Sequence, residues 1–251
     1  LQYNEESNPN GLTDDNFFQR RAELFGGAIA YVNPMLPSGV DFDANDDGEI
    51  DNVIFMIRGS HEGCGKFLWP HKSSLHASGL YLGGILVTRY NLGLEYISGV
   101  SVACHEFTHT LGAPDYYHYS EESIFEPVGL WDVMSHNQNP PQHTSAFTKW
   151  KYLGWIADIP IISPNQTYTL NPLNHPTPTN VAYRIISPNT PNEYLLVEYR
   201  RNYGLFESSL PNKGLLVWRV KTDCGNGNAD GPPDEVYIYR PYGSSDGGGQ
   251  I

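Results

Sequence analysis

Residues 104–115 read CHEFTHTLGAPD and contain the pattern His-Glu-x-x-His, a zinc-hydrolase signature when it lies on a helix. Residues four positions apart share one helical face, so His105 and His109 can direct two imidazoles at one metal ion. Glu106 is rotated by about 100° from His105, so its carboxylate lies beside that face and need not ligate the metal. Zinc lowers the pKa of a bound water towards ~7, and a nearby carboxylate can then accept the proton. The stretch therefore predicts a zinc site with Glu106 as general base.

The residues around the two histidines favour a helix that ends soon after the second one. Apolar residues recur at three- and four-residue steps, so we expect this face to bury into a core while the histidine face looks into a cleft; they are Val100, Ala103, Cys104, Phe107 and Leu111. Gly112 is a typical helix-ending glycine, and Pro114 keeps the helix from resuming. Asp115 follows His109 at the spacing where the long metzincin motif places its third ligand, usually a histidine. Because an aspartate oxygen is an acceptable zinc ligand, we predict that His105, His109 and Asp115 hold the zinc ion. Other residues remain as alternatives for the third ligand: His118, Glu122 and Glu126.

An acidic stretch upstream has the spacing of a calcium-binding loop. Residues 43–51 read DANDDGEID, which places oxygen-bearing side chains and Gly48 at the positions that an EF-hand loop uses. Ile54 stands where the last, bidentate glutamate is usual, and the apolar run 53–57 predicts a strand instead of a helix. The sequence thus predicts a loop–strand calcium site without its usual last ligand. The expected ligands are Asp43, Asn45, Asp47, Asp51 and the carbonyl of Glu49. The alternative is an acidic turn that binds no ion.

A methionine in a turn is the next informative feature. Residues 129–135 read GLWDVMS, and metzincins place a methionine in a tight turn beneath the metal. We predict that Met134 has this Met-turn role, with its thioether packed under the site without ligating the metal. The alternative is an ordinary core methionine.

The composition limits the partners and the location of the protein. The chain has 28 acidic and 15 basic residues and a formal net charge of −13, which argues against binding to nucleic acid or to anionic membranes. No run of 18 apolar residues exists, so no membrane-spanning helix is expected. The first residues are not a signal peptide, and we expect a secreted or cell-surface protein whose signal peptide has been removed. We also expect a monomer.

The sequence pattern changes after residue 157. Prolines then separate short β-type runs at 166–170, 181–187, 193–200, 214–220 and 235–240. Strands at this spacing, with turn residues between them, are typical of an antiparallel sandwich. We therefore predict a catalytic domain over residues 1–157 and a β-rich domain over residues 158–251.

These motifs resemble one known family. The central motif is His105-Glu106-x-x-His109-x-x-Gly112-x-Pro114-Asp115-x-Tyr117. It resembles the immune inhibitor A-type family of secreted bacterial metallopeptidases, for which an aspartate in place of the third histidine is characteristic. The Asp- and Gly-rich segment before the first strand and the Trp-Asp-x-Met sequence are also similar to that family. The resemblance is strongest over residues 43–59 and 100–155.

The resemblance implies an α+β protein with a metzincin-like catalytic domain: a mixed sheet, an active-site helix and a Met-turn, followed by the β-sandwich-like domain. It implies a secreted zinc endopeptidase that hydrolyses protein or peptide substrates with a metal-activated water and Glu106 as general base. Two other functions fit the motifs. One is a catalytically silent metal-binding surface or adhesion module that binds protein or glycan, although the intact Glu106 argues against it. The other is a zinc amidohydrolase that acts on non-peptide substrates.

Overall fold

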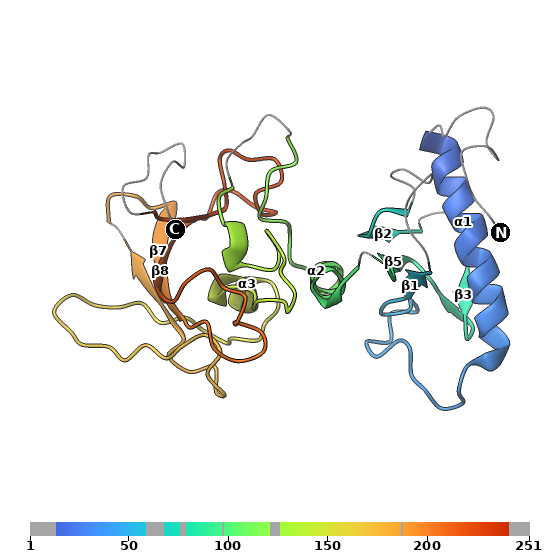
Figure 1. Cartoon of the computed structure of the whole chain (residues 1–251), viewed down its shortest axis with the longest axis horizontal. Coiled ribbons are helices and arrows are strands. Elements are labelled where there is room, and N and C mark those ends of the chain that lie inside the picture. Colours follow the sequence, from blue (N-terminus) through green and yellow to red (C-terminus); the bar gives the residue numbers. More distant parts are fainter. Residues whose placement is uncertain are drawn as a thin grey trace. The chain divides into compact units, whose positions relative to one another are not determined.

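The computed structural model describes residues 14–58, 68–75, 79–96, 98–120, 126–186 and 188–240, with side chains from residue 19 onward (Figure 1). The chain divides into two compact units, Leu1–Thr110 and Leu111–Ile251. Among the helices described, none combines the length and the hydropathy that a membrane span requires. The mixture of helices and strands agrees with the predicted α+β class. The domain boundary after residue 157 stays a prediction.

The first unit is built on a small mixed sheet. Its strands are β1 (Ile54–Ile57), β5 (Arg89–Leu94) and β2 (His71–Ser74), in the order β1-β5-β2. The outer strand β1 pairs parallel with β5, and β2 pairs antiparallel with it. A separate hairpin joins β3 (Tyr81–Leu82) to β4 (Ile85–Leu86). This sheet supports the two helices of the unit.

Helix α1 (Asp14–Val32) covers this sheet and is followed by the 3-10 turn η2 (Asn33–Met35) (Figure 1). Its Phe25 is fully buried, with its ring stacked 4.0 Å from Phe55 of β1 and tilted 4.7 Å from Tyr90 of β5. Aromatic pairs at such distances add to the free energy of simple burial. The helix is thus fixed to the central strand by an aromatic cluster.

Helix α2 (Val100–Thr110) carries the His-Glu-x-x-His pattern and follows β5. It is held to that strand by a polar contact, because the buried Asn91 donates from Nδ2 to the carbonyl of Glu106 at 2.6 Å. Asn91 Oδ1 also accepts from the hydroxyl of Thr110 at 3.0 Å. The buried residues of α2 are mainly polar: Ser101, His105, Glu106 and Thr108.

The expected burial of the apolar stripe is wrong for four of its five members. The exposed members are Val100, Ala103, Phe107 and Leu111, and Cys104 is half-buried. The physical reason is that Asn91 bonds the backbone and hydroxyl groups on the other side of the helix, so the polar side faces the strand. Hydrogen bonding has outweighed the apolar periodicity as the determinant of the buried face.

The second unit contains a four-stranded antiparallel sheet, in the order β6-β7-β8-β9. Its strands are β6 (Ala182–Ile186), β7 (Glu193–Arg200), β8 (Gly214–Lys221) and β9 (Val236–Ile238). Side chains along β7 alternate between buried and half-buried, as a one-sided sheet requires. Leu196, Trp218 and Ile238 are neighbours in register and are fully buried. A second sheet packed on this one is not among the described elements, so the β-sandwich stays a prediction.

The part of the second unit before the sheet carries the turn that contains Met134. The 3-10 turn η4 (Gly129–Trp131) precedes it, and helix α3 (Ala146–Lys151) follows. Ser145 caps α3, because its side chain accepts a hydrogen bond from the Thr148 N–H. These short elements are held together by buried polar groups rather than by long regular structure.

The contribution of the aromatic cluster to the stability of the first unit can be tested by mutation. Phe25→Ala removes a fully buried ring, which typically costs about 3–5 kcal/mol in proteins. We expect faster amide hydrogen exchange in β1 and β5, because local unfolding of the sheet becomes easier. The exposed Tyr31 on the same helix provides the control, since Tyr31→Ala should leave this exchange almost unchanged. Equal exchange rates in the two variants would contradict the role of the cluster.

Candidate metal centre

The two histidines of α2 face each other across one helical turn. His105 Nε2 lies 3.1 Å from His109 Nε2, and the two rings are perpendicular. His105 is buried and His109 is half-buried. In a tetrahedral zinc site, nitrogen ligands at ~2.0–2.1 Å from the metal lie about 3.3 Å from each other. The observed separation therefore fits a pair of imidazoles that share one metal ion.

Asp115 completes a group of three metal-ligating side chains. One ligand atom from each of His105, His109 and Asp115 lies within 4.8 Å of the others. Within the described residues, this is the only group of three or more His, Cys, Asp or Glu side chains that lie so close together. Two imidazoles and a carboxylate are a donor set that suits zinc and leaves a fourth position for water. The residues present therefore fit the metal that the motif predicts.

The bend that returns Asp115 towards the histidines depends on Gly112. The φ angle of Gly112 is +107°, a conformation that L side chains rarely adopt. After the bend, the chain is buried from Ala113 to Tyr116. This local sequence explains why the helix ends at Thr110 and why the third side chain can return so soon.

The carboxylate of Asp115 receives a short hydrogen bond from a tyrosine. The hydroxyl of Tyr119 lies 2.5 Å from Asp115 Oδ2. Burial and the adjacent Asp115 carboxylate raise the pKa of Tyr119 well above its ordinary value, so its hydroxyl stays protonated and donates. Hydrogen bonds of this kind orient metal-ligating carboxylates in proteins. Tyr119 could not be singled out from the sequence, because it lies in a tyrosine-rich run without a distinguishing pattern.

Glu106 lies beside the metal-binding face and is nearly buried. It lines a small pocket together with residues of β1, β5 and α2, among them Ile54, Met56, Leu92 and Val102. The rest of the lining is apolar apart from Asn91 and Ser98, so Glu106 is the one ionisable side chain among the described residues of this pocket. Its backbone carbonyl is held by Asn91, which fixes this turn of the helix.

Two of the alternative third ligands, His118 and Glu126, form contacts with other side chains. His118 Nε2 lies 2.6 Å from Asp234 Oδ1, and both side chains are almost fully buried. Glu126 is exposed and lies 3.7 Å from Nδ1 of His136. Glu122 lies outside the described residues. The structure therefore brings Asp115, and neither His118 nor Glu126, to the two histidines.

Met134 is fully buried in a turn whose backbone bonds the metal-ligand segment. Its carbonyl accepts a hydrogen bond from the Tyr116 N–H at 2.9 Å, next to Asp115 in sequence. Its own N–H donates to Asp132 Oδ1 at 2.9 Å. The turn thus connects the third predicted ligand to the buried carboxylate of Asp132. The Met-turn role of Met134 stays a prediction.

Asp132 joins this turn to the start of α3. Its Oδ2 accepts from the Ser145 N–H at 2.7 Å and from the Thr148 hydroxyl at 3.1 Å. The Thr148 hydroxyl is also 3.0 Å from the hydroxyl of Tyr116. Burial raises the pKa of Asp132, and the hydrogen bonds from Met134 and Ser145 oppose that shift. Asp132 belongs to the Trp-Asp-x-Met sequence, but its structural role was not predicted, because that role depends on a helix cap 13 positions away.

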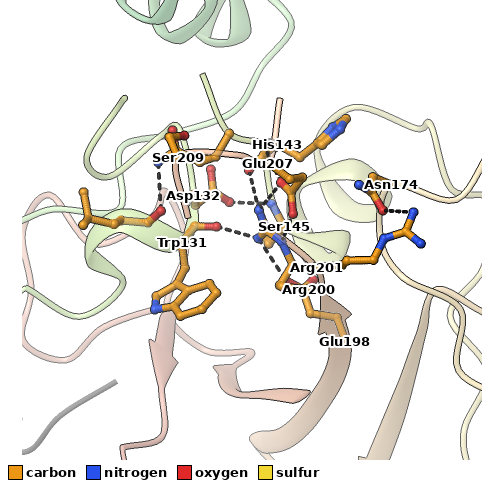
Figure 2. Close-up of polar contacts among 12 residues, drawn as sticks. Trp131, Asp132, His143, Ser145, Asn174, Glu198, Arg200, Arg201, Glu207 and Ser209 are labelled. Atoms are coloured by element: carbon orange, nitrogen blue, oxygen red, sulfur yellow. Dashed lines mark hydrogen bonds and ion pairs between the residues drawn. The ribbon is translucent and has the colours of Figure 1, made fainter. Parts of the chain in front are cut away.

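Arg200 at the end of β7 lies at the centre of the same buried network (Figure 2). Its guanidinium donates to both carboxylate oxygens of Glu207 at 2.8 and 2.6 Å and to Glu198 at 3.2 Å. It also donates to the backbone carbonyls of Trp131 at 2.6 Å and His143 at 3.4 Å. These five contacts match the five N–H donors of arginine. Burial lowers the pKa of Arg200, but Glu207 and Glu198 outweigh burial and raise it overall.

The carboxylates of the predicted calcium loop accept hydrogen bonds from backbone N–H groups of the same loop. Asp43 accepts from the N–H groups of Asp47 at 3.0 Å and Gly48 at 2.8 Å. Asp51 Oδ2 accepts from the Ala44 N–H at 3.1 Å, and Asn45 lies beside Asp47. The side chain of Glu49 turns to Thr88, which leaves its carbonyl as the predicted ligand. Within the described residues the loop carboxylates do not form a close metal-ligating group.

Comparison with known proteins gives one match. Residues 45–145 match the family described as immune inhibitor A peptidase M6, catalytic domain. A search of curated proteins and a search of solved structures each found no match. The matched segment contains the two histidines, Asp115 and Met134, so the resemblance found in the sequence is confirmed, and it supports a metallopeptidase.

The contribution of the Arg200 network to the stability of the second unit can be tested by mutation. Arg200→Gln leaves Glu198 and Glu207 buried without their cation, and breaking a buried pair in this way costs about 3–5 kcal/mol. We expect this loss in the free energy of unfolding, measured in urea by tryptophan fluorescence, because four of the five tryptophans lie after residue 110. Lys221→Gln removes a cation from the surface pair with Asp223 and should have a much smaller effect. A loss no greater than that of the control would show that the network is not stabilising.

Proposed function

We propose, from the match of residues 45–145 to the immune inhibitor A peptidase catalytic domain, that this protein is a secreted zinc-dependent endopeptidase. The observation that supports it most is the gathering of His105, His109 and Asp115 within 4.8 Å. On this proposal these three side chains hold zinc, and Glu106 is the general base. The substrate is a protein or peptide.

On this proposal zinc and Glu106 perform the chemistry, and Asn91 and Tyr119 position the groups that take part. Zinc, when held there, supplies a Lewis acid and lowers the pKa of a bound water towards ~7. Glu106 follows His105 directly, and its carboxylate takes a proton as water adds to the peptide carbonyl, then gives it to the leaving amine. Asn91 fixes the backbone of Glu106, and Tyr119 orients the carboxylate of Asp115.

Two features favour an enzyme over a silent metal-binding module. The general base is retained one position after the first histidine, and it is one of the residues that line a small, mainly apolar pocket. A module that only grips protein or glycan has no need of that carboxylate. An amidohydrolase acting on non-peptide substrates would share the metal centre, so a peptide-library digest distinguishes it from an endopeptidase.

We also propose that residues 43–51 bind a structural calcium ion. Asp43, Asp47 and Asp51 lie within one tight loop, held by hydrogen bonds to backbone N–H groups. Closely spaced carboxylates repel one another, and a divalent cation removes that repulsion. The loop precedes β1, which lines the Glu106 pocket, so calcium would stabilise one wall of that pocket.

The catalytic proposal is tested by Glu106→Gln in the zinc-loaded protein. Removing a general base should lower kcat for casein cleavage by about 10²- to 10⁴-fold while zinc stays bound, because Glu106 is not a ligand. A chelator should abolish cleavage by the unaltered protein, and added zinc should restore it. Glu95→Gln, at an exposed glutamate of the same unit, should keep full activity. Full activity in the Glu106 variant would eliminate the proposed role of that residue.

The calcium proposal is tested by titration calorimetry at constant zinc. The unaltered protein should bind one calcium ion per chain, and Asp47→Asn should weaken binding by about tenfold or more, because ligand charge sets the affinity of such loops. Asp158→Asn, at an exposed position in the other unit, should bind calcium as the unaltered protein does. If the unaltered protein shows no calcium binding, residues 43–51 form an acidic turn only.

A further inference from the structure

Residues 227–236, here termed the clasp, contact the stretch that carries Asp115. The clasp residue Asn228 donates from its backbone N–H to the carbonyl of Asp115 at 2.9 Å. Its side-chain Nδ2 donates to the carbonyl of Tyr116 at 3.2 Å, across 112 positions of sequence. Both contacts lie within the second unit. A segment distant in sequence thus binds the carbonyl groups of two successive residues, Asp115 and Tyr116.

Gly227 permits this close approach. A Cβ at this position would overlap the carbonyl oxygen of Asp115 and lie 2.8 Å from Cβ of Pro114. The φ angle of Gly227 is +75°, which also disfavours any other residue. A side chain here would have to displace the Asp115 backbone or the clasp. Gly225 provides a contrast, because a Cβ on Gly225 would meet no atom within 4 Å.

The clasp is itself fixed to buried groups. The fully buried Glu235 accepts from the Gly227 N–H at 2.8 Å and from the Tyr152 hydroxyl at 2.6 Å. Glu235 also forms an ion pair with Lys151. Asn228, fully buried, exchanges hydrogen bonds with the backbone of Val236 at 2.8 and 3.1 Å. These contacts tie the clasp to α3, and its last residue is the first residue of β9, so its position is set by α3 and by the sheet.

The clasp also contacts the residues that follow Asp115. The Tyr119 N–H donates to the carbonyl of Ala229 at 2.9 Å, and His118 is paired with Asp234. The backbone of Tyr119 is thus held by the same segment that holds Asp115. Because the Tyr119 hydroxyl bonds the Asp115 carboxylate, the clasp sets the position of that carboxylate through two routes.

We infer that the clasp is a positioning element of the metal centre, which sets the place of Asp115 and of its hydrogen-bond donor Tyr119. The inference rests on the proposed zinc function. It makes the segment 227–236 part of the catalytic unit, although this segment lies far beyond the signature motif. Gly227 and Asn228 are positioning residues, and they act on the metal through Asp115.

The experiment compares Gly227→Ala with Gly225→Ala in the full chain. Zinc affinity is measured by competition with a chromophoric chelator, and the Co²⁺-substituted proteins are compared by their visible absorption, which reports ligand geometry. Disturbing groups that orient a metal ligand typically weakens metal binding by about 10- to 100-fold. We expect that loss and an altered cobalt spectrum for Gly227→Ala, and neither for Gly225→Ala.

A double-mutant cycle with Asp115→Ala separates positioning from a general structural effect. If Gly227 acts through Asp115, Gly227→Ala should change zinc affinity by no more than about twofold once Asp115 is absent. An equal loss in both backgrounds, or no loss in the unaltered background, would overturn the inference. Should Gly227→Ala fail to fold by circular dichroism, Asn228→Asp, which keeps the side-chain shape, is judged by the same two criteria.

The same measurements give a different result if Asp115 is not a zinc ligand. If Asp115→Ala binds zinc as tightly as the unaltered protein, the proposed third ligand is wrong, and the clasp has no metal ligand to position. If Asp115→Ala weakens zinc binding and the clasp variants do not, the proposed function stands and the clasp inference alone is overturned.

Discussion

The structure of the site depends on one constraint: a metal ligand supplied by a loop must be held by contacts other than helical hydrogen bonds. His105 and His109 need little support, because one turn of α2 places their nitrogens 3.1 Å apart. Asp115 lies beyond the helix, where the chain has bent at Gly112. Its position is instead set by the hydrogen bonds of Tyr116, Tyr119 and Asn228.

Those hydrogen bonds lead into a set of buried charged groups. Tyr116 bonds the Met134 carbonyl, Met134 bonds Asp132, and the carbonyl of Trp131 beside Asp132 accepts from Arg200. Buried charges are costly unless their partners are complete, and the five donors of Arg200 are all used. Such a network tolerates few alternative arrangements, which suits a segment that must hold a metal ligand within a few tenths of an ångström.

Local features of the site could be predicted from the sequence because they depend on spacing within a few residues. The pairing of His105 with His109 follows from helical periodicity, and the return of Asp115 follows from Gly112 and Pro114. The strand β1 was likewise predicted by the apolar run 53–57. The family match over residues 45–145 covers this same locally determined region.

The supporting contacts could not be predicted, because they join residues that no local pattern connects. Asn228 lies 112 positions from Tyr116, and Arg200 lies 69 positions from Trp131. The buried side of α2 was also predicted wrongly, since Asn91 on β5 draws the polar side of the helix towards the strand. In each case a side chain bonds a backbone group that only the tertiary fold brings near.

The most direct test of the account is X-ray absorption spectroscopy at the zinc edge of the purified protein. We expect one zinc ion per chain with two imidazole nitrogens and oxygen ligands at ~2.0–2.2 Å, and no sulfur. A spectrum with a sulfur ligand or a single imidazole, or a protein that takes up no zinc, would contradict the assignment of His105, His109 and Asp115.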